Sequence, residues 1–108
     1  MTIASGNVSH TEGGETTANG YCSHAEGYHT TVSGNYSHVE GSFTTANGHC
    51  SHAEGEYTIA TGNHQHVQGK YNIAQGDLNT EMAFIIGNGT SNQNRSNAFA
   101  VDWNGKIY

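Results

Sequence analysis

The chain has 108 residues, a formal net charge of −6 at pH 7, 33% hydrophobic residues, 15 glycines and no proline. This length suits one domain, and the composition excludes a conventional core of large aliphatic side chains. The basic residues, Lys70, Arg95 and Lys106, all follow residue 69, so we expect no nucleic-acid partner, because phosphate binding needs clustered cations.

A strict internal repeat organises residues 1–78. The motif Ser-His-Xaa-Glu-Gly and its variants recur every 14 residues, and a motif of the type Thr-Ala-Asn-Gly occupies the other half of each period. A solenoid places one such repeat in each coil, whereas a disordered chain has no reason to keep the period. We therefore expect an all-β solenoid of 14-residue coils. The glycines of the second motif are Gly6, Gly20, Gly34, Gly48, Gly62 and Gly76.

The repeat CSHAEGYHTTVSGN at residues 22–35 predicts two short strands, SHAE and TTVS, each followed by a glycine. Side chains alternate between the faces of a strand, so Ala25 points away from His24 and Glu26. Small apolar residues recur at the positions of Ala25 and Val32, and we assign both columns to the inside of a thin coil. The glycines suit turns with positive φ or close backbone approach. A threonine column on the inner side contains Thr16, Thr30, Thr44 and Thr58.

Two further columns combine apolar, aromatic and histidine side chains, as a seam between chains would. Stacked Ala, Val and Thr bury little area, so one chain should be marginally stable and gain stability by oligomerisation. Cys22 and Cys50 stand two coils apart, about 10 Å, too far for a disulfide, and free thiols suit a reducing compartment. The two columns are Val8, Cys22, Tyr36, Cys50, His64 and Leu78, and His29, Phe43, Tyr57 and Tyr71.

Residues 79–108 depart from the repeat and carry the bulky apolar side chains. The segment NGTSNQNRSN predicts a loop, and DWNGKIY predicts a hairpin turn through Asn104 and Gly105. A solenoid needs an end that covers its open edge, so we interpret this region as a C-terminal β cap. We place Trp103 in an inter-chain core, with a sugar-binding aromatic at the tip as the alternative. The cap residues are Phe84, Ile86, Phe99 and Trp103.

Two glycine-ended strands in 14 residues, xxAxG followed by xTAxG, resemble the head repeats of trimeric autotransporter adhesins, the YadA-like head. The resemblance covers residues 2–87, and AFIIGNG at 83–89 is its closest single match. It implies a left-handed parallel β-roll with one coil per repeat, packed as a homotrimer. The chain departs from the family in its first strand, where His and Glu replace apolar residues.

The His/Glu-rich form of the repeat, together with the ending RSNAFAVDWNGKIY at residues 95–108, resembles tail-fibre and appendage proteins of bacteriophages and prophages of Gram-positive bacteria. In those proteins this ending typically precedes a C-terminal module, often a self-cleaving intramolecular chaperone. The resemblance implies a virion appendage, whereas the repeat alone does not separate a phage protein from an adhesin.

The repeated histidines and glutamates share one strand face, and each coil places its pair over the pair below. A column of glutamates without countercharge would be repulsive, and histidine is the only candidate cation in residues 1–69. We interpret the rows as His–Glu pairs, within or between chains, that fix register and trimer state and respond to pH. The expected ladder contains His10, Glu12, His24, Glu26, His38, Glu40, His52, Glu54, His66 and Gln68.

Metal binding is the alternative reading of the histidines. In NHQH we expect His64 and His66 on one strand face. A threefold assembly would then gather six imidazoles, which suit an octahedral transition ion such as Fe, Ni or Co. The chain would in that case be a metal-stabilised trimeric structural tip.

The expected function is mechanical. We predict a stiff trimeric shaft or head of a phage or prophage tail appendage that presents or contacts the host surface, with the head of a bacterial surface adhesin as the alternative. We expect no enzyme, because identical groups recur in every coil whereas catalysis needs unlike groups at one place. Contact with a host glycan or protein would use Tyr21, Tyr28, Tyr57 and Tyr71.

The expected location follows from these assignments. The sequence contains no apolar run near the roughly 20 residues that span a bilayer, so we expect no signal peptide and no membrane insertion. We expect it in the virion, as part of a tail appendage assembled in the host cytoplasm. The bacterial cell surface is the alternative that the adhesin reading implies.

Overall fold

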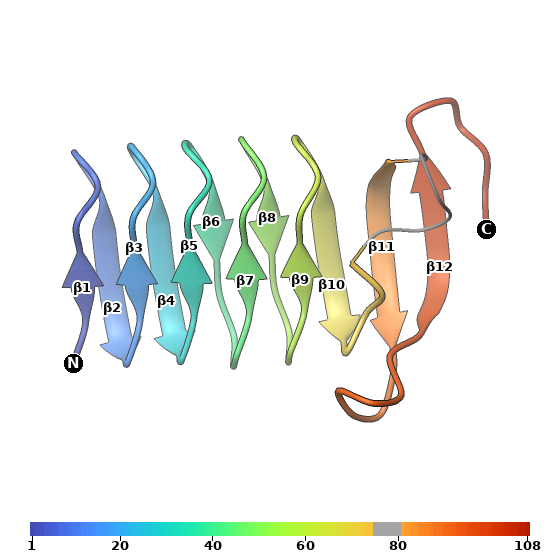
Figure 1. Cartoon of the computed structure of the whole chain (residues 1–108), viewed down its shortest axis with the longest axis horizontal. Coiled ribbons are helices and arrows are strands. Elements are labelled where there is room, and N and C mark those ends of the chain that lie inside the picture. The colour runs from blue at the N-terminus through green and yellow to red at the C-terminus, as the bar shows by residue number, and fades with distance from the viewer. Residues whose placement is uncertain (75–80) are drawn as a thin grey trace.

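Each 14-residue repeat forms one coil of a β-solenoid and contributes one strand to each of two sheets. The computed structural model describes residues 1–74 and 81–108, and its coils follow one another along the longest axis (Figure 1). The principal extents are 37 × 27 × 15 Å, so the molecule is thin along its shortest axis. The expected all-β solenoid of 14-residue coils is confirmed.

The strands of the described residues divide between a five-stranded and a seven-stranded sheet. The first sheet contains, in spatial order, β1 (Ile3–Ala4), β3 (Thr17–Ala18), β5 (Thr31–Val32), β7 (Thr45–Ala46) and β9 (Ile59–Ala60). The second contains β2 (His10–Gly14), β4 (His24–Tyr28), β6 (His38–Val39), β8 (His52–Ala53), β10 (His66–Lys70), β11 (Met82–Asn88) and β12 (Asn97–Asp102).

Neighbouring strands of the repeat region are parallel and offset by one repeat. His24 of β4 pairs with His38 of β6, and Thr31 of β5 pairs with Thr45 of β7. The same register continues through both sheets, so equivalent residues of successive coils lie above one another. The 14-residue period in the sequence therefore becomes a set of straight columns in space.

Two columns of small apolar side chains fill the space between the sheets, as predicted. Their members in the second to fifth coils are fully buried. Ala4 is exposed and Thr11 half-buried, because β1 and β2 are edge strands, and Ala74 after the last of these coils is also half-buried. At the other end Met82 and Ile85 of β11 bring larger side chains into the same core. The buried column members are Ala18, Val32, Ala46 and Ala60, and Ala25, Val39, Ala53 and Val67.

Columns of buried hydroxyl side chains flank this apolar core. The threonines at positions 16, 30, 44 and 58 are fully buried, which confirms their predicted place on the inner side. The serines that precede the SHAEG histidines are also buried. Ser23 Oγ donates to the Gly20 carbonyl at 2.6 Å, and Ser51 Oγ donates to the Gly48 carbonyl at 2.6 Å. These hydrogen bonds close the turns that lead into β4 and β8, whereas Ser37 Oγ before β6 donates to the Gly48 carbonyl of the next coil at 2.7 Å.

The glycines that follow the two strands of each repeat form two columns, represented by Gly27 and Gly34. They meet the predicted requirements of positive φ or close backbone approach. Gly27 has φ +109°, and a Cβ there would lie 2.0 Å from the carbonyl oxygen of Gly41 in the next coil. At Gly34 a Cβ would lie 2.0 Å from the Gly48 carbonyl oxygen, although φ is not positive. A side chain in either column would therefore push two coils apart.

Bulky residues occupy left-handed backbone positions, although the sequence predicts positive φ only for glycines. Phe43, Tyr57 and Tyr71 have φ values of 56°, 55° and 45°, a conformation that costs an L-residue roughly 1–2 kcal/mol. The backbone N–H of Phe43 donates to Tyr28 O at 2.9 Å in the previous coil, and that of Tyr57 donates to Ser42 O at 2.9 Å. This turn points the side chain outward while its amide stays paired. The same conformation occurs at Val8, Glu15, Cys22, His29, Tyr36, Cys50 and His64.

The C-terminal region extends the second sheet. β11 pairs in parallel with β10 and β12 returns antiparallel to β11, with residues 89–96 forming the predicted loop between them. The predicted hairpin turn after β12 is confirmed, because Gly105 N–H donates to Asp102 O at 3.0 Å and Asp102 N–H donates to Lys106 O at 3.0 Å. Gly76, Leu78 and the expected boundary between residues 78 and 79 lie outside the described residues.

Among the described residues the structure contains no helix with the length and hydropathy that a membrane span requires.

The glycine geometry makes a prediction about stability. Gly27→Ala should lower the free energy of unfolding by at least about 2 kcal/mol, because the methyl group meets a backbone carbonyl and the residue keeps a positive φ. Urea unfolding followed by circular dichroism measures this change.

Gly14→Ala is the matched control. Its Cβ would lie 3.2 Å from Cδ2 of the exposed Tyr28 ring, which can move aside, so the expected loss is below about 1 kcal/mol. Equal losses in the two variants would contradict the proposed role of close coil approach.

Candidate functional site

The outer face of the second sheet carries a continuous ladder of histidines and glutamates. His24, His38 and His52 lie above one another on successive strands, and their rings stack with centroid distances of 4.7 and 4.8 Å. His66 continues the stack at 4.6 Å, while His10 meets His24 edge-on at 4.8 Å. We use the name His–Glu ladder for His10, His24, His38, His52 and His66 together with Glu12, Glu26, Glu40 and Glu54.

Each glutamate of the ladder pairs with the histidine of the following coil. Glu26 Oε1 lies 3.0 Å from His38 Nε2, and Glu40 Oε1 lies 3.2 Å from His52 Nε2. The pairs Glu12–His24 and Glu54–His66 measure 3.4 and 3.1 Å. A carboxylate only accepts hydrogen bonds, so Nε2 carries the proton and donates it in the pairs of His38, His52 and His66. His24 Nε2, by contrast, makes no hydrogen bond to Glu12. The pairing expected from the sequence is therefore present within one chain, between adjacent coils.

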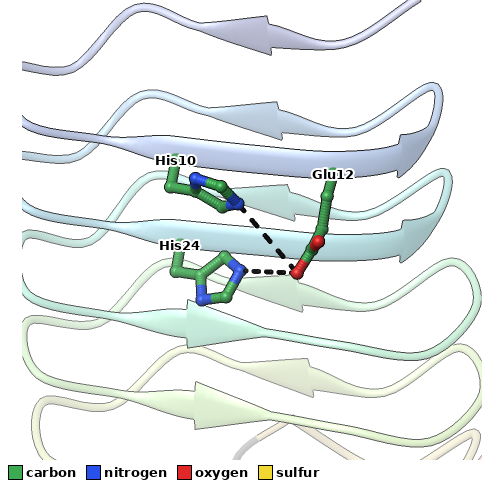
Figure 2. A group of neighbouring side chains, drawn as sticks. All are labelled: His10, Glu12 and His24. Carbon is green, nitrogen blue, oxygen red and sulfur yellow. Dashed lines mark ion pairs between the residues drawn. The ribbon is translucent and has the colours of Figure 1, made fainter.

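Figure 2 shows the first unit of the ladder, in which one carboxylate faces two imidazoles. Glu12 Oε1 lies 3.4 Å from His24 Nε2 and 4.0 Å from His10 Nε2 on its own strand. The side chains of His10 and Glu12 are more than half exposed, whereas that of His24 is 38% exposed. The ladder is thus a surface feature that becomes better covered from the second coil onward.

The His–Glu ladder ends at β10, because the next strand, β11, carries no histidine at the paired position. Gln68 occupies the glutamate position of β10, and the next strand places Phe84 over His66 and Ile86 over Gln68. The Phe84 ring meets the His66 ring edge-on with centroids 5.2 Å apart. A carboxylate therefore occurs in each coil whose successor supplies a histidine, and an uncharged amide occurs where the successor supplies a phenylalanine.

The pairing alters the acidity of two glutamates. The hydrogen bond from His38 holds the pKa of Glu26 below its ordinary value of 4.5, against the opposing effect of burial. The hydrogen bond from His66 lowers the pKa of Glu54 in the same way. Both carboxylates also feel the neighbouring imidazoles of their own strand. Each therefore stays ionised into more acid solution than a free side chain would.

The ladder also brings together groups that bind metal ions. Four sets of two histidines and one glutamate place a ligand atom from each residue within 4.8 Å of the others. Two imidazole nitrogens and one carboxylate oxygen form a donor set typical of Zn²⁺ and other divalent transition ions. The sets are His10–Glu12–His24, His24–Glu26–His38, His38–Glu40–His52 and His52–Glu54–His66.

The metal pair expected from NHQH is not on one strand face, which corrects the sequence analysis. His64 lies in the turn before β10 with φ 62°, and its ring contacts His49 and Trp103 at centroid distances of 6.1 and 6.4 Å. His66 lies on β10 and stacks on His52. Strand alternation predicts a shared face only for residues within one strand, and the left-handed turn at residue 64 breaks it.

One edge of the solenoid carries a stack of flat rings. His29, Phe43, Tyr57 and Tyr71 lie parallel to one another with centroid distances of 4.8, 4.6 and 4.7 Å. Tyr28 meets both His29 and Phe43 edge-on. We call His29, Phe43, Tyr57 and Tyr71 the aromatic stack. The sequence identified this column, and the structure adds that its rings stack face to face.

The opposite turn carries a second aromatic row with a different geometry. Tyr21, Tyr36, His49 and His64 contact one another edge-on with centroid distances of 5.6, 5.4 and 6.1 Å. Trp103 extends this row beyond His64. We call these five residues the zigzag row. The sequence columns missed it, because its members alternate between two adjacent positions of the turn.

The four tyrosines expected to contact a receptor divide between these two edges. Tyr21 belongs to the zigzag row, and Tyr57 and Tyr71 belong to the aromatic stack with Tyr28 beside it. Tyr21 and Tyr28 are exposed, whereas Tyr57 and Tyr71 are half-buried. They therefore do not form one surface patch.

The residues expected in a cap lie on and after the last two strands. Ile86 pairs with Phe99 across β11 and β12, and Phe84 meets Phe99 with ring centroids 6.4 Å apart. These three side chains are half-buried, while Trp103 is 54% exposed in the single chain. Cys22 and Cys50 are free, as predicted, and both are exposed in the single chain.

Comparison with family models, with curated proteins and with solved structures gives no match to the chain. Its function must therefore be inferred from its own residues and geometry.

The lowered pKa values predict a loss of stability in acid. Glu26 and Glu54 stabilise the folded chain fully above their ordinary pKa of 4.5, and this contribution is lost as the pH falls through the lower folded values. Glu26→Gln/Glu54→Gln should therefore show a smaller drop in the free energy of unfolding between pH 5 and pH 3 than the unaltered chain, measured by urea unfolding.

Glu56→Gln is the control, because Glu56 is exposed and lies outside the ladder. Glu15 and Asp102 also have lowered pKa values and remain unchanged in both variants. An acid-induced drop of the same size in the ladder variant and in the control would contradict the coupling.

Proposed function

We propose that the chain is a rigid trimeric segment of a phage or prophage tail appendage, which presents or contacts the surface of the host cell. The proposal combines the repeat solenoid with the resemblance of its motifs to YadA-like heads and to His/Glu-rich appendage proteins. In this proposal the coils form a left-handed β-roll and three chains pack side by side.

The observation that carries the trimer is the row of uncovered apolar and aromatic side chains along both edges. Val8 is 77% exposed, Tyr36 is 55% exposed and Phe43 is 37% exposed. The core beneath them consists mostly of alanine and valine, so one chain buries little apolar area for its length. Packing the edges against other chains would remove these side chains from water, at about 25 cal/mol per Å² of apolar area.

A mechanical role suits the repetition of one structural unit. Adjacent coils are joined by backbone hydrogen bonds in both sheets, by ring stacking and by His–Glu pairs. The same groups recur in each coil of the ladder, which is the pattern of a structural element rather than of a catalytic centre. Such a stack resists bending because each coil is held at several points around its perimeter.

We propose that residues 79–108 act as the C-terminal cap of this segment. Asn72 Oδ1 accepts from Ile59 N–H at 2.8 Å and Asn72 Nδ2 donates to Ile59 O at 3.0 Å, so a side-chain amide pairs the backbone of the last strand in the first sheet. Asn97 pairs with the backbone of Ile73 in the same way. Arg95 donates to the carbonyls of Tyr57 and Asn72 at 2.9 and 3.0 Å.

The proposal predicts the mass of the particle in solution. Light scattering at pH 8 should give about three times the chain mass of 11.5 kDa. The same measurement at pH 5 and with chelator shows whether the ladder helps to hold the chains together. A monomer under every condition would contradict the trimer and the resemblance on which it depends.

Two matched variants locate the seam. Phe43→Ser changes the aromatic stack and Tyr36→Ser changes the zigzag row, and each replaces one outward ring at a left-handed position. The substitution in the seam should shift the mass toward the monomer, while the other should leave the trimer intact. A trimer that survives both substitutions at low micromolar concentration would show that neither edge is the seam.

A further inference from the structure

We propose that the His–Glu ladder binds two divalent transition-metal ions per chain, with Zn²⁺ as the representative ion. Each ion would be held by two imidazoles from adjacent coils and the carboxylate between them. The inference rests on the ladder geometry and does not depend on the trimer or on the appendage function.

The distances between the histidine nitrogens and the glutamate oxygens suit two ligands that bind the same ion. A tetrahedral Zn²⁺ with bonds near 2.0–2.1 Å separates its ligand atoms by roughly 3.3 Å. The Nε2···Oε1 distances of the four pairs, 3.4, 3.0, 3.2 and 3.1 Å, are close to this value. The second imidazole of each set lies within 4.8 Å, and a small tilt of its partly exposed ring brings it into reach.

The first unit holds a second indication. His24 Nε2 is buried from solvent and has no hydrogen-bond partner in the described structure, although it lies 3.4 Å from Glu12 Oε1. A buried polar atom without a partner costs free energy. An ion between Glu12, His10 and His24 would satisfy this nitrogen and would take the place of the Nε2 proton.

The donor set selects the class of ion. Imidazole nitrogen is a preferred ligand of Zn²⁺, Ni²⁺ and Cu²⁺, whereas Ca²⁺ and Mg²⁺ require several oxygen ligands. Each set offers one carboxylate and two histidines. The remaining coordination positions face solvent and would hold water, so these sites are open and exchange their ions readily.

The sharing of histidines sets the number of ions. His24, His38 and His52 each belong to two neighbouring sets. A neutral imidazole that binds one ion through Nε2 cannot give the same nitrogen to a second ion, and two divalent ions one coil apart would repel each other. At most two of the four sets are therefore filled at once: the first and third, the second and fourth, or the first and fourth.

Because neighbouring sets share histidines, the single variants His38→Gln and His24→Gln should bind different numbers of ions. Nonspecific binding to surface side chains would not produce this difference. His38→Gln leaves the sets at His10–His24 and at His52–His66 intact and unshared, so two ions should still bind. His24→Gln leaves two sets that share His52, so one ion should bind. His24→Gln/His52→Gln removes a ligand from all four sets, and binding should be lost.

The experiment is isothermal titration with ZnCl₂ at pH 7.5, using the full 108-residue chain without an affinity tag. The expected numbers of ions per chain are two for the unaltered chain, two for His38→Gln, one for His24→Gln and none for the double variant. The control His49→Gln/His64→Gln removes two histidines outside the ladder and should still bind two ions. MgCl₂ should give no binding.

Equal stoichiometry in His24→Gln and His38→Gln, or loss of binding in the His49→Gln/His64→Gln control, would overturn the proposal. Circular dichroism establishes that each variant is folded before titration. If the double variant unfolds, ¹⁵N spectra of the imidazoles in the unaltered chain decide the question. Zn²⁺ should then shift the ladder nitrogens and leave those of His29, His49 and His64 in place, and the reverse pattern would exclude the ladder.

Discussion

Every column of the protein depends on backbone hydrogen bonds that hold each coil directly over the one before. His24 N–H donates to Ser37 O at 3.0 Å, and Thr31 N–H donates to Thr44 O at 3.0 Å, one bond in each sheet. This spacing leaves no room for a side chain where the coils approach most closely, which fixes glycine at those turns. It also sets the separation of every outward side chain, so rings stack and carboxylates reach imidazoles without any further arrangement.

The ladder shows how such a stack handles charge. Glutamates placed one above another would repel each other. In the ladder each carboxylate is instead directed toward the histidine of the next coil, which reduces this repulsion. Position 68, which lies beside Phe84 and Ile86 on β11, carries glutamine where the earlier coils carry glutamate, and it follows the same rule. Ionised groups therefore occur on this face where a partner occurs, and the face becomes apolar where the coil pattern changes.

The period, the inner columns and both glycine columns could be predicted from the sequence, because each depends only on residues that recur at one spacing. The turns could not. Placing His64 and His66 on one face assumed an extended backbone, and the left-handed conformation at residue 64 turned the first side chain toward Trp103. Nothing in the residue types at Phe43 or Tyr57 indicates a positive φ, since glycine usually takes that conformation. The hydrogen bonds to the previous coil are what stabilise it.

The direction of the His–Glu pairing also lay beyond the sequence. A glutamate could have turned to the histidine of its own strand, of the coil below or of the coil above, and the choice depends on side-chain rotamers. Glu26 lies 3.0 Å from His38 of the following coil. The zigzag row was missed for a related reason, because Tyr36 and His49 occupy different positions of the repeat and become neighbours only through the turn.

The side-chain amide of Asn72 gives the two ends of the stack different properties. Asn72 occupies the backbone groups of Ile59 that another strand of the first sheet would use, whereas β1 at the opposite edge has no such amide among the described residues. The interior coils, by contrast, are interchangeable in their backbone contacts. One repeat inserted between two coils would lengthen the molecule by a single strand spacing, about 4.8 Å, without changing either end. Duplication or deletion of 14-residue units would therefore change the length of the molecule in whole steps of one coil.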